Sequence, residues 1–495
     1  MEIQQRPSLG ERRETNRALR AAASPETAEQ TGDFYSVQIR LAARRLRDWL
    51  PSQKKGSLKF YSAKGNTYME RALFINSFIY GRNTSFAAVV TVQARFVQLK
   101  RHALTALLLL ATFLGMTAVA TAQVQVNGTG NPGIDIPAVQ AAVNAGGTVI
   151  LNGSFSFTGP GTGSPLRTIT ISNSVHISGV VDKQGAMTTI ANGQIPFLVA
   201  APGADVTIDG LQFENSAASA IRIEAAQNVR VSGCEFHGIV PVPTVVSGAT
   251  VPLATAISGS VGPFGSVSIV GNDIDVGGTA VDSTNGMILF GPMNSLEVSD
   301  NNIRNTTAHG IDLRNIIGEA GVERNEVSTG LVGRGGEPGR FVDAIRCVGP
   351  GIYVVEHNSF DTGFENAAGI RLAGTTGASV HANDITMSVP YTATPGAQSA
   401  AIQVQGSADD NEILQNQVRG QARVAFSVIH SDFALDKGTG TGDPVDTIFV
   451  GNNHQGLDAT LVDLEIGIGA TNTQILGGSG TISDLGTGTV VQGGY

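Results

Sequence analysis

The sequence predicts an all-β solenoid, in which one short unit is repeated along an axis. Its second half repeats the pattern aliphatic-x-x-Asn-x, then Ile, Val or Phe, at intervals of 24 to 36 residues. The asparagines of this pattern are Asn272, Asn301, Asn325, Asn358, Asn383, Asn416 and, in a weaker copy, Asn452. A second motif, Gly or Ala followed by Ile-x-Leu, recurs between them, and 62 glycines suit tight corners. A constant sequence repeat, separated by segments of variable length, is typical of a solenoid whose insertions lie in loops.

Charge divides the chain into two parts. Residues 1–101 hold 18 Lys+Arg and 8 Asp+Glu, out of 32 and 41 in the whole chain, so the rest holds 14 and 33, a net of −19. The acidic part has two lysines, Lys183 and Lys437, and no basic footprint, so we expect no nucleic acid partner. Residues 1–99 form an Arg-rich N-terminal extension without a motif. We interpret it as disordered, as an over-extended start that really begins near Val97, or as a genuine cytoplasmic extension.

Residues 100–122 have the features of an export segment. Lys100-Arg101-His102 precede an uncharged run, 103–122, which ends in Ala120-Thr121-Ala122. A positive flank, an apolar stretch and an Ala-x-Ala site predict a signal peptide cleaved before Gln123. The alternative is an uncleaved transmembrane anchor, because such a run can just span a bilayer. Both interpretations export residues 123–495 and predict a secreted, extracellular or periplasmic location, with membrane attachment only if residues 103–122 stay uncleaved.

The exported part begins with a short helix. Asp135 is a suitable N-cap, Pro137 fits the first turn, and apolar residues share one face of 135–143. Gly146-Gly147 then predict a stop, and residues 148–151 a strand. A helix ahead of the first coil could cap the open edge of the solenoid.

Each later coil contains a second strand that begins with the Gly/Ala-Ile-x-Leu motif. Strict alternation predicts that one set of its side chains points inward: Ile311, Leu313, Ile345, Cys347, Ile370 and Leu372. The other cysteine, Cys234, is 113 residues before Cys347, about four coils away at about 4.8 Å per coil. A disulfide cannot reach so far, so we expect both to be small buried hydrophobic residues.

Together, the Gly/Ala-Ile-x-Leu strand, the Asn corner and the opening Asp-to-Gly-Gly-Thr-Val-Ile segment resemble the right-handed parallel β-helix, or pectin-lyase-like, superfamily. The resemblance covers residues 131–495 and implies one domain of three-stranded coils. It implies that the asparagines stack inward at one corner, where their amides bond along the stack and tolerate left-handed backbone. Cys234 and Leu211 replace Asn in the first coils.

The resemblance also implies a groove along the first strand of each coil, walled by loops. Charge on the outward positions of that strand gathers on three consecutive coils. The candidate catalytic residues there are His309, Asp312, Asp343, Arg346 and Arg371. Candidate substrate-binding residues are Arg314 on a strand, Arg340 in loop 328–342 and Tyr391 in loop 386–399. Loops are where solenoids place function.

Three interpretations of this patch remain open. In a polysaccharide lyase, Arg346 and Arg371 would hold a uronate carboxylate while His309 or an arginine takes the α proton. In a glycoside hydrolase, Asp312 and Asp343 would be the acid and the base. In the third, exposed ion pairs such as Asp312–Arg346 join neighbouring coils without a function. The sequence therefore predicts an exported protein that acts on or binds polysaccharide, or a non-catalytic surface scaffold or adhesin.

Some features argue against an enzyme. Residues 123–495 contain no Trp and three tyrosines, although sugar sites commonly use aromatic faces. The net charge of −19 would also repel a polyuronate. We predict no cofactor and no metal, because the acidic pairs Asp409-Asp410 and Asp273/Asp275 lack a regular calcium-ligand spacing. The oligomeric state is left open.

Overall fold

The computed structural model describes residues 123–158, 168–246, 249–262, 265–277, 283–329, 342–362, 367–388, 399–431, 442–477 and 480–493. The predicted extension 1–99 and export segment 100–122 lie outside these residues. Within them, no helix has both the length and the apolar character needed to cross a membrane.

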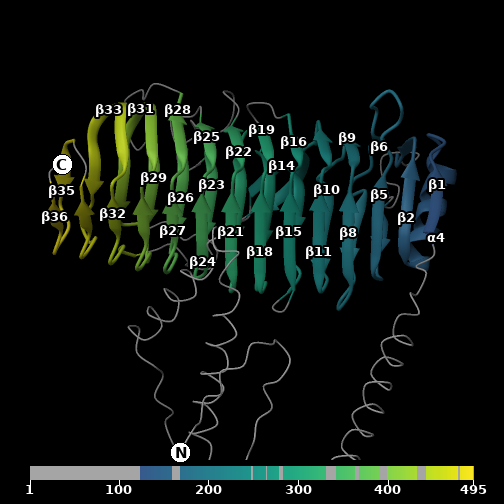
Figure 1. The fold of residues 1–495 in the computed structure, drawn as a ribbon, viewed down its shortest axis with the longest axis horizontal. Coiled ribbons are helices and arrows are strands. Elements are labelled where there is room, and N and C mark those ends of the chain that lie inside the picture. Colours follow the sequence, from purple (N-terminus) through teal and green to yellow (C-terminus); the bar gives the residue numbers. More distant parts are fainter. Residues whose placement is uncertain are drawn as a thin grey trace, which may run out of the picture. The chain divides into compact units, whose positions relative to one another are not determined.

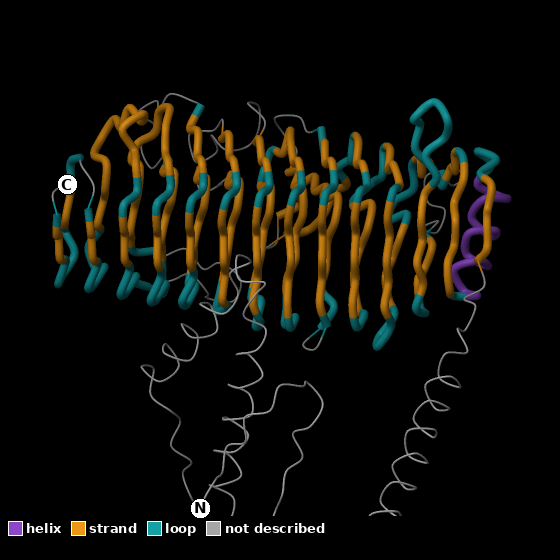
Figure 2. The backbone as a smooth tube through the Cα atoms, in the orientation of Figure 1, coloured by secondary structure: helices purple, strands orange, loops and turns teal. Residues whose placement is uncertain are grey.

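The described chain is a right-handed parallel β-helix, as the sequence predicts. Its coils stack along one axis, and short turns join the strands within a coil (Figures 1 and 2). We call the three strand ladders faces A, B and C. In each coil the chain runs through faces B, A and C in that order.

Face A is a sheet of fourteen parallel strands. In order along the sheet they are β1 (Gln123–Asn127), β2 (Gly147–Asn152), β5 (Val175–Gly179), β8 (Asp205–Asp209), β11 (Asn228–Ser232), β15 (Ser266–Val270), β18 (Ser295–Ser299), β21 (Glu319–Glu323), β24 (Ile352–Glu356), β27 (Ser379–His381), β30 (Glu412–Leu414), β32 (Ile448–Val450), β34 (Gln474–Leu476) and β36 (Val490–Gln492).

Face B carries the Gly/Ala-Ile-x-Leu strands. Its order is β4 (Ile169–Ile171), β7 (Phe197–Ala200), β10 (Ser219–Ala225), β14 (Ala249–Gly259), β17 (Ser283–Phe290), β20 (His309–Arg314), β23 (Val342–Val348), β26 (Ala367–Ala373), β29 (Ala400–Gln405), β31 (Gln417–Ile429), β33 (Asn453–Ile466) and β35 (Ile482–Asp484). The added strand β13 (Val242–Val246) pairs with β14 in the antiparallel direction.

Face C follows the asparagine corner. Its strands are β3 (Ser154–Ser156), β6 (Thr188–Ala191), β9 (Leu211–Glu214), β12 (Glu235–His237), β16 (Asp273–Asp275), β19 (Asn302–Thr306), β22 (Glu326–Thr329), β25 (Ser359–Thr362) and β28 (Asp384–Met387), followed by the first parts of β31 and β33. These two long strands continue into face B, so faces B and C form one sheet at that end.

The interior is filled by the side chains predicted to point inward. The six aliphatic and cysteine positions from Ile311 to Leu372 are fully buried, which confirms the predicted alternation. In the early coils the core holds packed aromatics: Phe197 and Phe213 meet edge to face with ring centroids 5.7 Å apart, and Phe213 and Phe236 stack at 5.0 Å. Both cysteines are free and buried, and burial raises the pKa of the Cys234 thiol to about 12.

A helix packs on the first coils, as predicted, but it begins earlier. Helix α4 (Pro132–Ala145) has Asn131 as its N-cap, whose side chain accepts from the N–H of Gly133 at 3.0 Å. The predicted N-cap, Asp135, lies inside the first turn. Its buried carboxylate accepts from the N–H and hydroxyl of Thr129 at 2.9 and 2.8 Å and from Ser156 N–H at 3.2 Å. The wrong N-cap arises because Pro132 at the first helical position extends the helix by one turn.

The predicted asparagine ladder is present at the corner between faces A and C. Each Asn accepts at its Oδ1 from the backbone N–H and the Nδ2 of the preceding Asn. At Asn358 these bonds from Asn325 are both 2.9 Å. Its own Nδ2 donates to Asn383 Oδ1 and to the carbonyl of Val322, each at 2.9 Å. The ladder runs from Cys234, whose N–H donates to Asn272, to Asn452.

Left-handed backbone at this corner belongs to the residue before each asparagine, not to the asparagine itself. Its φ is +57° at Asp300, +53° at Arg324 and +56° at His357. Non-glycine residues adopt such angles at a cost. The repeated amide bonds of the ladder offset that cost in every coil, so the role assigned to the asparagine backbone was wrong while the role of its side chain is confirmed.

Candidate functional site

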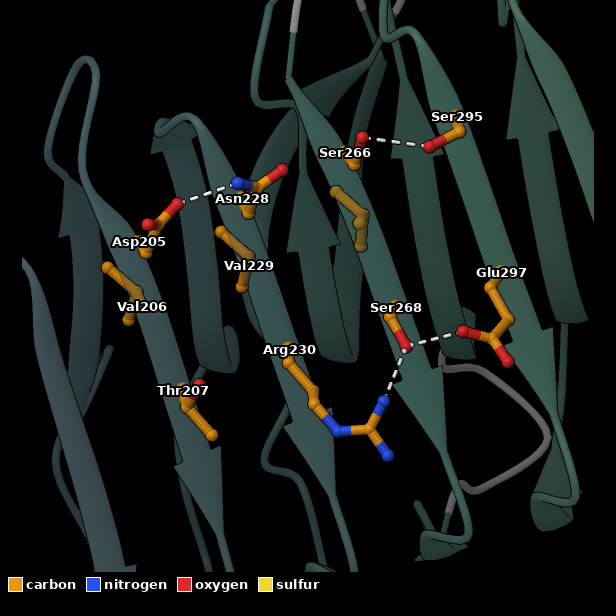
Figure 3. A pocket seen from close by; sticks show the side chains of 11 residues that line it. Asp205, Val206, Thr207, Asn228, Val229, Arg230, Ser266, Ser268, Ser295 and Glu297 are labelled. Carbon is orange, nitrogen blue, oxygen red and sulfur yellow. Dashed lines mark hydrogen bonds between the residues drawn. The ribbon is translucent and has the colours of Figure 1, made fainter. Parts of the chain in front are cut away.

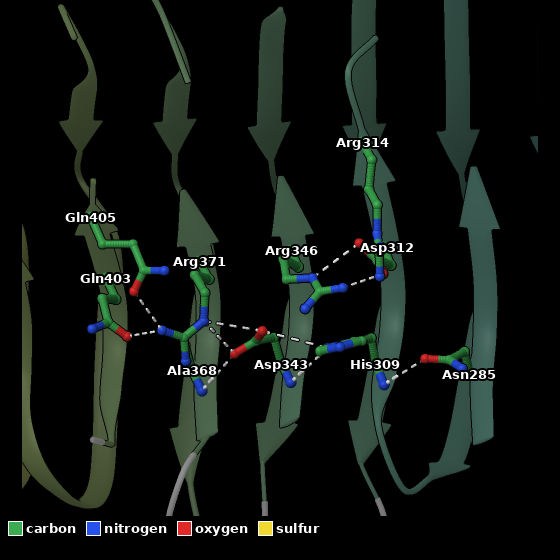
Figure 4. Close-up of polar contacts among 10 residues, drawn as sticks. All are labelled: Asn285, His309, Asp312, Arg314, Asp343, Arg346, Ala368, Arg371, Gln403 and Gln405. Carbon is green, nitrogen blue, oxygen red and sulfur yellow. Dashed lines mark hydrogen bonds and ion pairs between the residues drawn. The ribbon is translucent and has the colours of Figure 1, made fainter. Parts of the chain in front are cut away.

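The charged candidates lie on neighbouring strands of face B in the predicted register. Asp312 on β20 stands opposite Arg346 on β23, which stands opposite Arg371 on β26. His309 and Asp343 are paired three residues earlier on the first two of these strands. All five project from the side opposite the inward-facing Ile311 and Leu313. Figure 4 draws them with their partners, and we call the set His309, Asp312, Arg314, Asp343, Arg346, Arg371, Gln403 and Gln405 the face-B network.

These side chains do not line an exposed groove, which corrects the expectation from the resemblance. Asp312 and Asp343 are fully buried, Arg371 is 1% exposed, and Arg346 and His309 are each 7% exposed. The same outward column is open nearer the N-terminus, where the Arg222 side chain is 51% exposed. The ion pair Asp312–Arg346 exists, as the third interpretation predicted. It is a buried pair, whose energetics differ from those of an exposed one.

Asp312 is held by two arginines. Arg346 donates from Nε to Oδ1 at 3.0 Å and from Nη2 to Oδ2 at 2.5 Å. Arg314 donates to Oδ2 from Nε at 2.9 Å and from Nη2 at 2.6 Å. Burial alone would raise the pKa of Asp312, but the charges of Arg346 and Arg314 outweigh it and hold that pKa well below its ordinary range. Asp312 is therefore a carboxylate at neutral pH.

Asp343 is the second buried carboxylate of the network, and its main partner is Arg371. Arg371 donates from Nε to its two oxygens at 3.0 and 3.1 Å, and Ala368 N–H donates at 3.3 Å. Arg371 also donates from Nη1 to the side-chain oxygens of Gln403 and Gln405, the latter at 3.0 Å. Burial would raise the pKa of Asp343, but the Arg371 charge and His309 lower it overall. Both acidic candidates are thus ionised.

His309 sits beside Asp343. Its backbone N–H donates to Asn285 Oδ1 at 3.1 Å, the backbone N–H of Asp343 donates to its Nδ1 at 3.3 Å, and a carboxylate oxygen of Asp343 lies 3.4 Å from the same Nδ1. Burial, then the Arg346 charge, lower the pKa of His309 despite the nearby carboxylates. The imidazole is therefore neutral at pH 7. With its proton on Nδ1 the ring faces the Asp343 carboxylate and has a lone pair on Nε2, whereas with its proton on Nε2 the ring accepts at Nδ1 from the Asp343 N–H.

The network carries a surplus of positive charge. Its three arginines face two carboxylates and a neutral histidine. Nε2 of His309 and Nη1 of Arg346 make no hydrogen bond in the part of the chain that the structure describes. The site therefore offers a cationic donor at Arg346 Nη1 and, in the tautomer with Nδ1–H, a proton acceptor at His309 Nε2.

The structure leaves two candidates untested and adds others. Arg340 and Tyr391 lie outside the described residues. Gln403 and Gln405 belong to the network, and Asn285 contacts it through the His309 N–H, although the sequence did not single them out. The outward position of the two glutamines on their strand was the signal that could have found them. Tyr353, one of the few tyrosines, is fully buried and donates to the Val348 carbonyl at 2.9 Å, so it offers no face to a sugar.

Comparisons with known proteins yield no family. No family model matches the chain, and no curated protein matches it. Solved structures that are similar include the Dettilon tailspike protein, at 13% identity over 69% of this chain and 68% of that one, with a TM-score of 0.41. The surface adhesin PfbA of Streptococcus pneumoniae is 12% identical over 70% and 93%, with a TM-score of 0.37. An alginate lyase is 11% identical over 77% and 89%, with a TM-score of 0.39.

Likeness at this level carries no argument about activity. The strand pairings show directly that the described residues form a parallel β-helix.

Proposed function

We propose that the protein is exported and binds acidic polysaccharide over the face-B network, where a uronate undergoes β-elimination. The observation that supports this proposal is the pair of unused atoms, His309 Nε2 and Arg346 Nη1, within a network of net positive charge. A uronate carboxylate is an anion that a guanidinium recognises well. The local charge also offsets the repulsion expected from the acidic chain as a whole.

In this reaction Arg346 holds the uronate carboxylate. The neutral imidazole of His309, in the tautomer with its proton on Nδ1, takes the proton α to that carboxylate at Nε2. The electrons of the broken C–H bond form a C=C bond, the glycosidic C–O bond at the β carbon breaks, and the leaving oxygen takes a proton from water. The imidazolium then gives its proton to the resulting hydroxide. Asp343 keeps the imidazole oriented through Nδ1 and is a positioning residue. Asp312 orients Arg346 in the same way.

Glycoside hydrolysis is less well supported at these residues. A hydrolase needs one carboxylic acid that is protonated at the working pH, so that it can donate to the leaving oxygen. The pKa values of Asp312 and Asp343 are both lowered, and each carboxylate is already engaged by arginine. Neither residue is suited to be the acid.

A non-catalytic surface scaffold is the second candidate. The complete burial of Asp312 and Asp343 favours it, because a substrate must reach Nε2 and Nη1 past side chains that are almost closed to solvent. In this case the network only joins neighbouring coils. Export is common to both candidates and is tested by N-terminal sequencing of the exported protein, for which we expect Gln123 as the first residue.

The decisive experiment measures the ultraviolet absorbance of unsaturated product from alginate, polygalacturonate and hyaluronate. We expect Arg346→Ala to lower kcat/KM about a hundredfold, the effect of losing one preorganised donor to a developing charge. Arg346→Lys keeps the charge and should recover part of the rate. The matched control is Arg222→Ala, in the same outward column but exposed and paired with Glu224. Cleavage that survives Arg346→Ala would place the site elsewhere. If the protein neither cleaves nor binds these polymers, the non-catalytic scaffold is the better explanation.

A further inference from the structure

A depression of about 310 Å³ lies on face A, away from the face-B network. It crosses the four strands β8, β11, β15 and β18 (Figure 3). At about 4.8 Å between strands it spans about 14 Å, enough for a short oligosaccharide. The register forms its floor from two rows of outward side chains: Asp205, Asn228, Ser266 and Ser295 in one, and Thr207, Arg230, Ser268 and Glu297 in the other.

The floor of this depression is polar at every outward position. Its side chains are already ordered, because Arg230 Nη1 donates to Ser268 Oγ at 3.2 Å and that hydroxyl donates to Glu297 at 2.7 Å. Asn228 donates to Asp205 at 2.6 Å. Further along face A aliphatic residues also occupy outward positions, beside polar ones such as Glu319 and Glu412; the aliphatic ones are Ile352, Val354, Leu414, Ile448, Val450 and Leu476.

Arg230 stands out within it. Each of the other eight arginines in the described ranges makes an ion pair with Asp or Glu. Arg230 is exposed, has no such partner there, and bonds only one neutral hydroxyl. Its Nε and Nη2 donors are consequently available in the row of the floor that it shares with Thr207, Ser268 and Glu297 (Figure 3).

We infer that this depression binds a neutral oligosaccharide. Arg230 supplies donors only, Asp205 and Glu297 supply acceptors only, and the hydroxyls and Asn228 supply both, which is the mixture that a set of sugar hydroxyls can satisfy. Two carboxylates against one guanidinium leave the region with net negative charge, which disfavours an acidic sugar. No aromatic side chain lines the depression, so binding should be weak. This site is separate from the proposed reaction on face B.

The test uses the full chain, immobilised for surface plasmon resonance. The probes are hexamers of glucose, galactose, mannose and N-acetylglucosamine, with hexagalacturonate alongside. We expect at least one neutral hexamer to bind saturably, and Arg230→Met to weaken its binding about tenfold, as loss of a charge-assisted hydrogen bond does, while binding of hexagalacturonate stays unchanged. The control Arg419→Met removes another exposed arginine, on face C, and should change nothing. Thermal unfolding curves verify that both variants fold.

Three results would overturn the inference: no neutral hexamer binds, Arg230→Met weakens hexagalacturonate as much as the neutral hexamer, or the two arginine variants lose equal affinity. A wild-type protein that eliminates uronate but binds no neutral hexamer would overturn this inference alone. A protein that binds a neutral hexamer but does not eliminate uronate would support this inference and contradict the proposed reaction.

Discussion

The asparagine ladder and the face-B network are both buried stacks of polar side chains that pass from coil to coil. Every rung of the ladder is the same neutral amide with the same partners, repeated at one corner. The network is confined to a few coils, and its members differ in type and charge. Repetition is what a solenoid needs for its backbone. A buried ion pair, by contrast, is often no more stabilising than apolar residues of the same volume, so the stability of the coils does not explain the network.

The largest expected effect comes from removing one charge of the network. Asp343→Ala leaves the buried Arg371 without its carboxylate and the Ala368 N–H without its acceptor. We expect the free energy of unfolding to fall by about 3 to 5 kcal/mol, measured by urea denaturation. The control Asp361→Ala removes an exposed carboxylate from face C and should cost under about 1 kcal/mol. Equal losses in the two variants would mean that the network is not truly buried.

A slightly smaller effect is expected in the ladder. Asn358→Ala leaves the N–H and the amide of Asn325 without their acceptor in a buried corner. The cost should be about 2 to 4 kcal/mol by urea denaturation, because each lost bond orphans a buried group but no charge. Asn302→Ala is the control: its amide makes one 3.2 Å bond to Asp273 outside the ladder. A ladder variant no less stable than this control would contradict the structural role.

Lowering the pH should weaken the contribution of the face-B network to stability, but not that of the asparagine ladder. The pKa values of Asp312 and Asp343 are lowered on folding, so their stabilisation is complete above the ordinary carboxyl value of about 4 and is lost as pH falls through the folded values. The lowered pKa of His309 acts in the same direction, beginning below about pH 6.5. Urea curves recorded at successive pH values should show Asn358→Ala following the wild-type decline. The double variant Asp343→Leu/Arg371→Met should decline less, and parallel curves for all three would refute the assignment.

The smallest effect is expected where the network ends. Ser427 follows Gln403 in the outward column, and its buried hydroxyl has no hydrogen-bond partner among the described residues. Ser427→Ala should therefore leave the free energy of unfolding unchanged or raise it by up to about 1 kcal/mol. A loss above that amount, in the same urea assay, would show that the network continues through this residue.

The sequence was sufficient for the coils and their register because these depend on local, periodic features. The asparagine spacing locates each corner, and alternation assigns Ile311 inward and Asp312 outward. The start of α4 was misjudged because two cap residues compete there, Asn131 and Asp135, and only the packing of Asp135 against Ser156 decides between them.

The burial of the candidate site and the ionisation of its carboxyl groups could not be predicted in the same way. Alternation indicates that Arg346 points away from the core, but not whether solvent reaches it. Burial depends on segments far from the strand in sequence, and it changes the meaning of the Asp312–Arg346 pair from a weak surface contact to a costly buried one. The carboxyl pKa values that argue against hydrolysis follow from the same burial and from side-chain geometry.

The most direct test of the account is a double-mutant cycle on Asp343 and Arg371. Urea denaturation of Asp343→Leu, Arg371→Met and the double variant gives the coupling free energy between the two residues. If they form a buried pair, each single change is strongly destabilising, and the double variant recovers most of the loss, with a coupling of at least about 2 kcal/mol. A coupling below about 0.5 kcal/mol, as for exposed pairs, would contradict the buried network on which the proposed site depends.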